Sequence, residues 1–155
     1  MRFLRIALPA VGGLLLAACS APHPPEVTFF ADGTTIRLSP AQFCKPNAER
    51  CDGNADARGR MPVPGGKPLN ISVPTQVADA PWVVLFKYRK ADGSEEQGRT
   101  EVFKAGDKYA YTLNLPTAGD QLTDVEVQRI ANITAGADND VVFLTDASWV
   151  LEVTS

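Results

Sequence analysis

The chain has 155 residues, a length that supports one hydrophobic core. Hydrophobic residues make up 45% of it and charged residues 21%, which excludes a disordered, collagen-like or polytopic membrane protein. The formal charge of −3 argues against a nucleic-acid partner, because contacts to phosphates need a basic surface.

Residues 1–18 predict a lipoprotein signal peptide. A positively charged start precedes the uncharged stretch 6–18, which has the length of a signal-peptide hydrophobic region and falls short of the about 20 residues that span a bilayer. The stretch leads into Leu16-Ala17-Ala18-Cys19, which resembles the bacterial lipobox, in which the cysteine receives a diacylglycerol before cleavage. We therefore expect Cys19 to be the lipidated first residue of the mature protein. The alternative is an ordinary secretory signal that leaves Cys19 as a thiol.

Residues 19–25 read Cys-Ser-Ala-Pro-His-Pro-Pro, which predicts an extended tether outside the core. Loss of Arg2 and Arg5 with the signal leaves 13 basic residues against 18 acidic ones, a formal charge of −5. Anionic lipid heads do not attract such a body, so the acyl chains on Cys19 must hold it at the bilayer. We expect a lipid-anchored protein on the extracytoplasmic face of the cell membrane.

Two cysteines remain, Cys44 and Cys51, with six residues between them. An exported chain reaches an oxidising compartment, where an even pair most often forms a disulfide. Closing so short a loop contributes about 2–3 kcal/mol on the loop-entropy model. A zinc site and a redox pair are the competing interpretations. Both are weak, because the one histidine, His23, lies in the tether and the spacing is not that of a C-x-x-C motif.

Past the tether, apolar and polar residues alternate with the period of half-buried β-strands. The dipeptides Asp32-Gly33 and Asp92-Gly93 stand between alternating runs, which is the strongest short-range hairpin signal. No segment after the signal carries a convincing helical stripe. The expected strands are 26–31, 34–39, 67–73, 82–90, 96–103, 108–115, 124–131, 140–145 and 148–154, with weaker extended pieces at 42–44 and 58–63.

This series of short strands predicts an all-β domain over residues 26–155, an immunoglobulin-like antiparallel β-sandwich, with a small closed β-barrel as the alternative. Cys44 and Cys51 are too close in sequence to be the inter-sheet disulfide of antibody domains, so the prediction depends on strand number and pattern. No internal repeat and no long linker divides this region.

Several distinctive segments accompany the lipobox and the tether. They are Glu26-Val27-Thr28-Phe29-Phe30-Ala31-Asp32-Gly33, Phe43-Cys44 with Cys51, Ile71-Ser72-Val73-Pro74, Pro81-Trp82, Phe86-Lys87-Tyr88-Arg89, Tyr109-Ala110-Tyr111-Thr112-Leu113, Gln121-Leu122 and Val125-Glu126-Val127-Gln128. Together they resemble the actinobacterial lipoproteins grouped as domain of unknown function 2771, over nearly the whole mature chain. The resemblance implies a single-domain envelope lipoprotein with this disulfide and carries over no catalytic residue.

Few catalytic arrangements are available. A Ser–His–Asp or Cys–His arrangement needs a histidine in the folded domain, and His23 lies outside it. Glycoside hydrolysis needs only two carboxylates beside a cleft, but most acids stand in turns or on polar strand faces, where a solvated surface is the simpler interpretation. We therefore expect neither an enzyme nor a cofactor. The carboxylates considered are Glu95, Glu96, Glu101, Asp120, Asp124 and Glu126.

Asp52, Asn54 and Asp56 match the first three ligand positions of a calcium-binding loop. The match then fails, because Ala57 replaces the glycine of the tight turn and Val63 replaces the bidentate glutamate. We interpret the segment as a polar loop beside a disulfide, with weak calcium binding as the alternative.

Binding is the remaining functional class. Phe29 and Phe30 are consecutive strand residues and must point to opposite faces, so one lies either under a neighbouring element or on an exposed patch that meets a partner. The other aromatic candidates for a binding surface are Trp82, Tyr88, Phe103, Tyr109, Tyr111, Phe143 and Trp149. Most of them are in phase with aliphatic neighbours and are expected in the core. We expect a non-enzymatic module that docks an envelope protein or polymer. The alternatives are a lipid or glycolipid carrier with a cavity between the sheets, and a carboxylate-based glycan hydrolase.

Overall fold

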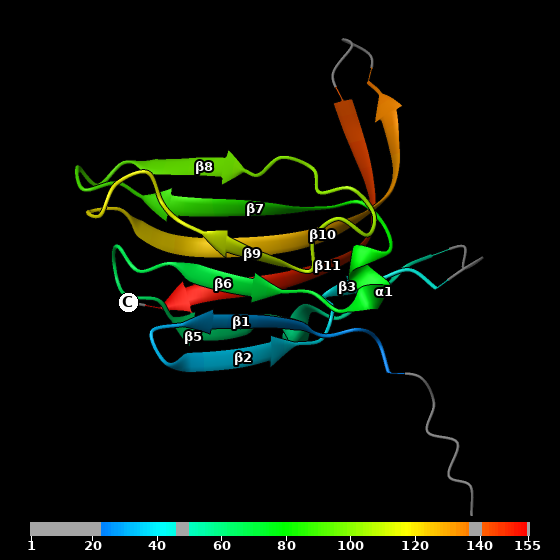
Figure 1. Ribbon diagram of the computed structural model, residues 1–155, viewed down its shortest axis with the longest axis horizontal. Coiled ribbons are helices and arrows are strands. Elements are labelled where there is room, and N and C mark those ends of the chain that lie inside the picture. The colour runs from blue at the N-terminus through cyan, green and yellow to red at the C-terminus, as the bar shows by residue number, and fades with distance from the viewer. Residues whose placement is uncertain (1–22, 46–49, 137–140, 155) are drawn as a thin grey trace, which may run out of the picture.

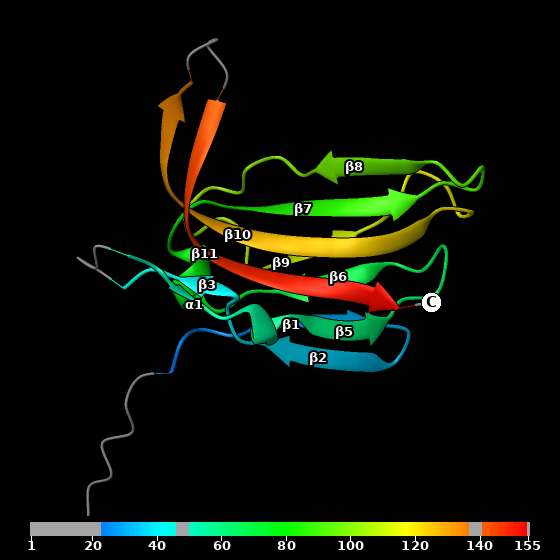
Figure 2. The same cartoon turned by 180° about the vertical axis from the view of Figure 1, so that it is seen from behind.

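The computed structural model describes residues 23–45, 50–136 and 141–154. Their strands form two sheets that pack face to face, here called sheet A and sheet B (Figure 1; Figure 2). The β-sandwich prediction is confirmed, and the closed-barrel alternative is wrong, because the two sheets keep separate edges.

Sheet A is antiparallel, with strand order β2-β1-β6-β9. Its first hairpin turns at Asp32 and Gly33, whose φ angles of 45° and 83° are the positive values that a two-residue hairpin loop requires. The Asp-Gly signal is therefore confirmed. The strands are β1 (Val27–Ala31), β2 (Thr34–Leu38), β6 (Leu69–Ser72) and β9 (Ala110–Leu113).

Sheet B has strand order β4-β3-β11-β10-β7-β8, and β5 pairs with β11 in parallel while all other pairs are antiparallel. Its long central ladder is β10 against β11. The strands are β3 (Gln42–Phe43), β4 (Asp52–Gly53), β5 (Gly59–Pro62), β7 (Trp82–Arg89), β8 (Glu95–Arg99), β10 (Gln121–Ala135) and β11 (Val141–Thr154).

Two short helical pieces accompany the strands, the 3-10 turn η1 (Ala55–Ala57) and the single α-helical turn α1 (Thr75–Ala78). One turn is too short to show a 3.6-residue apolar period in the sequence. Neither of the helices described is long and apolar enough to cross a membrane.

The expected break between strands 140–145 and 148–154 is wrong, because β11 runs without interruption through both. Thr145 pairs with Ile130 and Ala147 pairs with Arg129, so Asp146 is an extra residue in the ladder, a β-bulge. A bulge shifts the alternation by one residue, and the shift in the sequence pattern resembles a break between two strands. The strand expected at 96–103 is also shorter and ends at Arg99.

A second extra residue, Ala131 on β10, stands almost opposite the first. Bulges bend a strand pair, and beyond these two the ribbon of β10 and β11 turns away from the sandwich (Figure 1). We call this projecting ribbon the arm, residues 131–135 and 141–145. It exposes several large apolar side chains: Ile133, Val141, Val142 and Leu144.

The space between the sheets is filled by large side chains. Trp82, Trp149, Phe29 and Phe103 are each at most 2% exposed, and the ring centroids of Trp82 and Phe103 lie 4.5 Å apart. Both indole N–H groups are satisfied: Trp82 Nε1 donates to the Lys108 carbonyl at 3.1 Å and Trp149 Nε1 to the Pro25 carbonyl at 2.9 Å. Tightly packed side chains therefore fill the layer between the two sheets.

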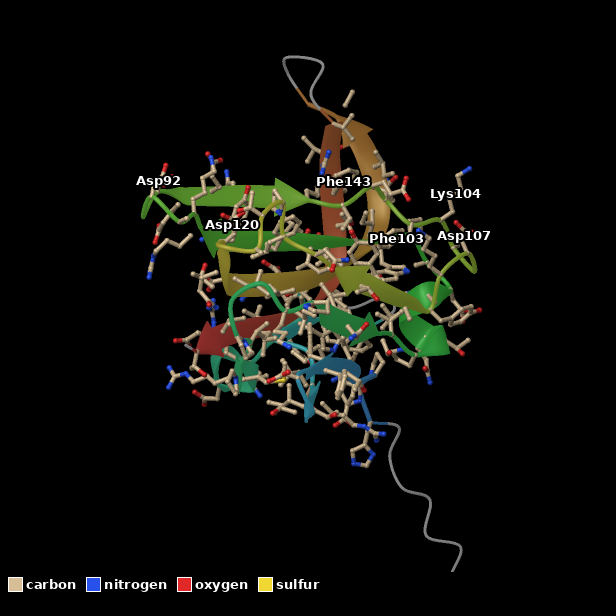
Figure 3. The ribbon with its side chains drawn as sticks, turned by 60° about the vertical axis from the view of Figure 1, so that its left-hand side comes forward. Asp92, Phe103, Lys104, Asp107, Asp120 and Phe143 are labelled. Carbon is tan, nitrogen blue, oxygen red and sulfur yellow. A yellow bond between two sulfur atoms is a disulfide. The ribbon has the colours of Figure 1, made fainter. Side chains whose placement is uncertain are left out.

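The sandwich has two unlike ends. At the turn end lie the connections 32–33, 63–68, 90–94 and 114–120, and Figure 3 shows Asp92 and Asp120 there. At the tether end lie the start of β1, the β2–β5 connection with β3 and β4, helix α1, the loop with Lys104 and Asp107, and the base of the arm (Figure 1; Figure 3).

Candidate functional site

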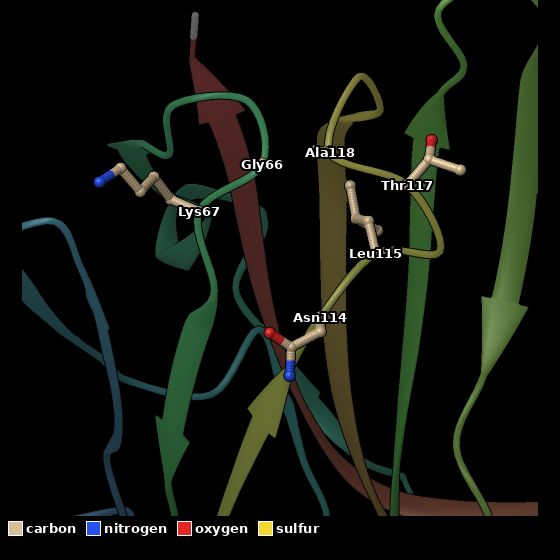
Figure 4. A pocket seen from close by; sticks show the side chains of 6 residues that line it. All are labelled: Gly66, Lys67, Asn114, Leu115, Thr117 and Ala118. Atoms are coloured by element: carbon tan, nitrogen blue, oxygen red, sulfur yellow. The ribbon is translucent and has the colours of Figure 1, made fainter.

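A groove of about 1200 Å³ opens at the tether end. Sheet A contributes Pro25, which precedes β1, and Pro40, which follows β2. Sheet B contributes Phe43 from β3 with Arg129 and Asp146 from the base of the arm. We call this depression the end groove. Its volume is somewhat above the about 300–1,000 Å³ of typical ligand-binding sites, whereas a depression at the turn end measures about 220 Å³ and is lined by Gly66, Lys67, Asn114, Leu115, Thr117 and Ala118 (Figure 4).

Backbone hydrogen bonds hold the sheet B wall of the groove on β11. Ala41 N–H donates to the Ser148 carbonyl at 2.8 Å, and Cys44 N–H donates to the Asp146 carbonyl at 2.7 Å. The disulfide between Cys44 and Cys51 then ties β3 to the start of β4. The disulfide prediction is confirmed, and closure of the short loop contributes about 2–3 kcal/mol to the stability of this wall.

The opposite wall comes from the tether itself. Pro24 and Pro25 line the groove, and the Pro25 carbonyl is bonded to the buried Trp149. Pro25 itself is only partly buried, but its carbonyl links the end of the tether to a core side chain. Proline lacks a backbone donor but keeps its carbonyl, which here satisfies the indole N–H of a core tryptophan.

The ion pair between Arg129 and Asp146 is the polar centre of the end groove. Arg129 Nη1 and Asp146 Oδ2 lie 2.9 Å apart, and the two side chains are only 26% and 22% exposed. Two further atoms of the pair, Arg129 Nε and Asp146 Oδ1, are buried without a hydrogen-bond partner. A buried polar group without a partner costs about 1–3 kcal/mol, so the pair holds unused donor and acceptor capacity beside the groove.

A second ion pair stands on the same groove wall. Lys45 Nζ and Asp52 Oδ2 lie 2.9 Å apart, and both side chains are 70% exposed. Hydrogen bonding to Asp52, reinforced by its charge, raises the pKa of Lys45. Because each cation in the groove faces a carboxylate at 2.9 Å, the site has no strong net field and suits a partner of little net charge.

Arg129 and Asp146 were not among the residues that sequence analysis singled out. The sequence does contain a sign of Arg129. Val125 and Val127 on β10 point into the core, and the alternation places Arg129 on the same face, where an apolar side chain is expected. Asp146 had no comparable signal, because its position depends on a bulge.

The suggested calcium ligands have other roles. Asp52 pairs with Lys45, and the Asn54 side chain accepts a hydrogen bond from Asp56 N–H at 3.1 Å as the cap of η1. Among the described residues, no group of three or more His, Cys, Asp or Glu side chains is placed to hold a metal ion. His23 lines the end groove and is exposed. Cys19 lies outside the described residues, and its lipidation stays a prediction.

The carboxylates considered for glycan hydrolysis do not gather in the end groove. Glu95, Glu96 and Glu101 form ion pairs with Arg89, Lys90 and Lys108, at 3.9, 2.8 and 3.5 Å. Asp120 accepts a hydrogen bond from Thr117 N–H at the turn end, and Glu126 accepts one from Gln128. Asp124 pairs in the ladder with Lys87 and Glu152.

The aromatic predictions divide into two groups. Trp82, Phe103 and Trp149 are buried in the core as expected, and Phe29 is fully buried while Phe30 is 42% exposed. Tyr109 is 47% exposed and is therefore one of the candidates that lie outside the core. Phe143 is half-buried in the arm with the Arg99 guanidinium 5.0 Å from its ring centroid.

These features define a β-sandwich protein with a groove at the end where its tether leaves. The chain belongs to the family described as protein of unknown function (DUF2771), whose model matches residues 20–154. It is 28% identical over 121 residues to uncharacterised proteins of Mycobacterium bovis and Mycobacterium tuberculosis, an alignment that covers 76% of this chain and 70% of each relative. No solved structure matches the chain significantly. The resemblance to family 2771 is thus confirmed.

Proposed function

We propose that the protein is a lipid-anchored, non-enzymatic binding module of the cell envelope that docks a protein or polymer partner in the end groove. The observation that carries the proposal is that the last residues of the tether, His23 to Pro25, form part of the groove wall. The lipid attachment and the binding site therefore belong to the same end of the molecule.

The chain between Cys19 and His23 limits how far the groove can lie from the membrane. Four residues span at most about 14 Å when fully extended. A lipid on Cys19 accordingly holds the groove close to the bilayer surface, where it meets partners that are themselves attached to the envelope.

The packing of the sandwich supports docking over a carrier function. A carrier with its ligand between the sheets needs an enclosed apolar cavity, but Trp82, Trp149 and Phe29 fill that layer at 0% exposure. The end groove is open to solvent and carries two ion pairs, which suits a surface contact with a chain or polymer.

The carboxylates of the groove support a non-enzymatic role. Asp52 and Asp146 both line it, and each faces a cation at 2.9 Å. Glycoside hydrolysis needs two carboxyl groups that flank the scissile bond, whereas both carboxylates of the groove are held in ion pairs.

Site-specific crosslinking of the native, lipidated protein in its envelope tests the proposal. A photo-reactive residue at Gln76, which lines the groove from α1, is expected to capture one defined envelope protein or polymer. The matched control is the same group at Lys87, which is exposed on the outer face of sheet B. Capture through Gln76 should fall in a Phe43→Ser variant. Equal capture at both positions, or capture of membrane lipid alone, contradicts docking.

The anchor is tested separately. Cys19→Ala is expected to move the protein from the membrane to the soluble fraction, because the covalent lipid is removed. A Cys19→Ala protein that stays with the membrane contradicts the proposed attachment.

A further inference from the structure

The two central rows of residues on the outer face of sheet A carry almost no charge. Its residues alternate with buried ones: Val27 and Phe29 on β1 point into the core, so Thr28 and Phe30 point outward. Cross-strand partners share a face, which places Thr35, Phe30, Asn70 and Thr112 in one row. The neighbouring row is Arg37, Thr28, Ser72 and Ala110.

The outer face of sheet B is different. Its cross-strand rows carry at least eight charged residues, six of them among the nine positions of the two rows that contain Asp124 and Glu126, whereas the eight positions on sheet A carry one, Arg37. The chain has 18 acidic residues, and none of them stands in the two rows of sheet A. The outer faces of both sheets are in contact with water, so solvation alone does not explain why one face is highly charged and the other is not. The charged residues of sheet B are Arg60, Lys87, Arg89, Glu95, Arg99, Asp124, Glu126 and Glu152.

We propose that the outer face of sheet A binds a neutral polysaccharide. Hydroxyl and amide groups in a row match the alternating donors and acceptors of sugar hydroxyls, and an exposed aromatic ring packs against the apolar C–H face of a sugar. Phe30, 42% exposed and flanked by Thr35 and Asn70, supplies that ring.

The geometry of the face fits an extended chain. Four strands at a spacing of about 4.8 Å give a platform about 14 Å across, the length of a short oligosaccharide. Thr112 Oγ1 donates to Asn70 Oδ1 at 2.8 Å, which fixes the orientation of the Asn70 amide before any ligand arrives. An anionic polymer or an acidic peptide finds one cation on this face, Arg37, so charge favours a neutral ligand.

This inference rests on the envelope location in the proposed function but not on the end groove. Phe30 lies on β1 in the middle of sheet A, whereas the groove is lined at the tether end. A variant at Phe30 therefore leaves crosslinking through Gln76 unchanged, and a variant at Phe43 leaves polysaccharide binding unchanged.

Affinity electrophoresis of the full mature chain in detergent tests the inference. Native gels that contain a neutral glucan or mannan are expected to retard the protein relative to gels without polymer. Phe30→Ala should weaken the interaction about fivefold, which corresponds to the about 1 kcal/mol of an aromatic contact, while Phe30→Tyr should keep it. Val142→Ala is the matched control, because Val142 is also 42% exposed but lies on the arm.

Several outcomes overturn the inference. They are an unchanged mobility of the wild-type chain in every neutral polymer, equal retardation of the Phe30→Ala and wild-type proteins, and retardation by anionic polymers only. A dimer in sedimentation analysis that Phe30→Ala disperses also overturns it, because the face then serves contact between two copies. Circular dichroism and an unfolding midpoint equal to the wild type confirm that the variants are folded.

Discussion

The two ends of the sandwich are built in different ways. At the turn end, short connections reverse the chain at Asp32-Gly33, Gly66 and Gly93, where the φ angles are positive. At the tether end, Trp149 bonds to Pro25 across 124 residues of sequence, and Arg129 pairs with Asp146, the extra residue of a β-bulge. Local backbone preferences thus shape the first end, and contacts between distant segments shape the second. The end groove lies at the end that depends on distant contacts.

The largest effect on the difference between the two ends is expected from removing the contact between Trp149 and Pro25, which holds the tether. Trp149→Ala deletes a fully buried ring and its bond to the Pro25 carbonyl, so we expect the free energy of unfolding to fall by about 3–5 kcal/mol, measured by chemical denaturation. Trp149→Phe keeps most of the packing and should cost about 1–2 kcal/mol. An equally small loss for both variants would show that the tryptophan does not organise the tether end.

Glycine-to-alanine substitutions test how strongly backbone conformation stabilises the turn end. Gly66 has φ +72°, and a Cβ there would approach the Ala118 carbonyl oxygen to 2.8 Å, so Gly66→Ala should cost about 2–3 kcal/mol in unfolding free energy. Gly33 has φ +83° with open space around it, so Gly33→Ala should cost only the backbone strain of about 1 kcal/mol. Gly53 at the tether end has neither constraint, and Gly53→Ala should be close to neutral. Equal losses of unfolding free energy at the three positions would contradict the proposed dependence of the turn end on positive φ angles.

The smallest expected effect concerns the turn between β7 and β8. The Ser94 hydroxyl and the Ser94 N–H both donate to Asp92 Oδ1, at 2.6 and 2.9 Å, and these bonds lower the pKa of Asp92 below its ordinary value of 3.8. The depressed pKa stabilises the folded state above pH 3.8, and this contribution is lost as pH falls through the folded pKa. Ser94→Ala should raise the pKa of Asp92 toward 3.8, as measured by NMR titration of its carboxyl carbon. A pKa that does not move would show that the N–H bond alone is responsible.

Much of this architecture follows from the amino-acid sequence alone. Period-two alternation predicted most strands of both sheets, the Asp-Gly dipeptides predicted two hairpins, and the pair Cys44 and Cys51, in a chain that we expect to be exported, predicted the disulfide. These features are local: each depends on backbone preferences or pairing within about ten residues, which adjacent residues specify.

Other features depend on segments that are far apart in the chain. Packing of the sheets buries Phe29 and exposes Phe30, and the Asp146 bulge joins two expected strands into β11. The end groove likewise requires the tether, β3 and the arm to meet at one end. Alternation specifies that two neighbouring side chains point to opposite sides, but only the position of the second sheet decides which side becomes the core.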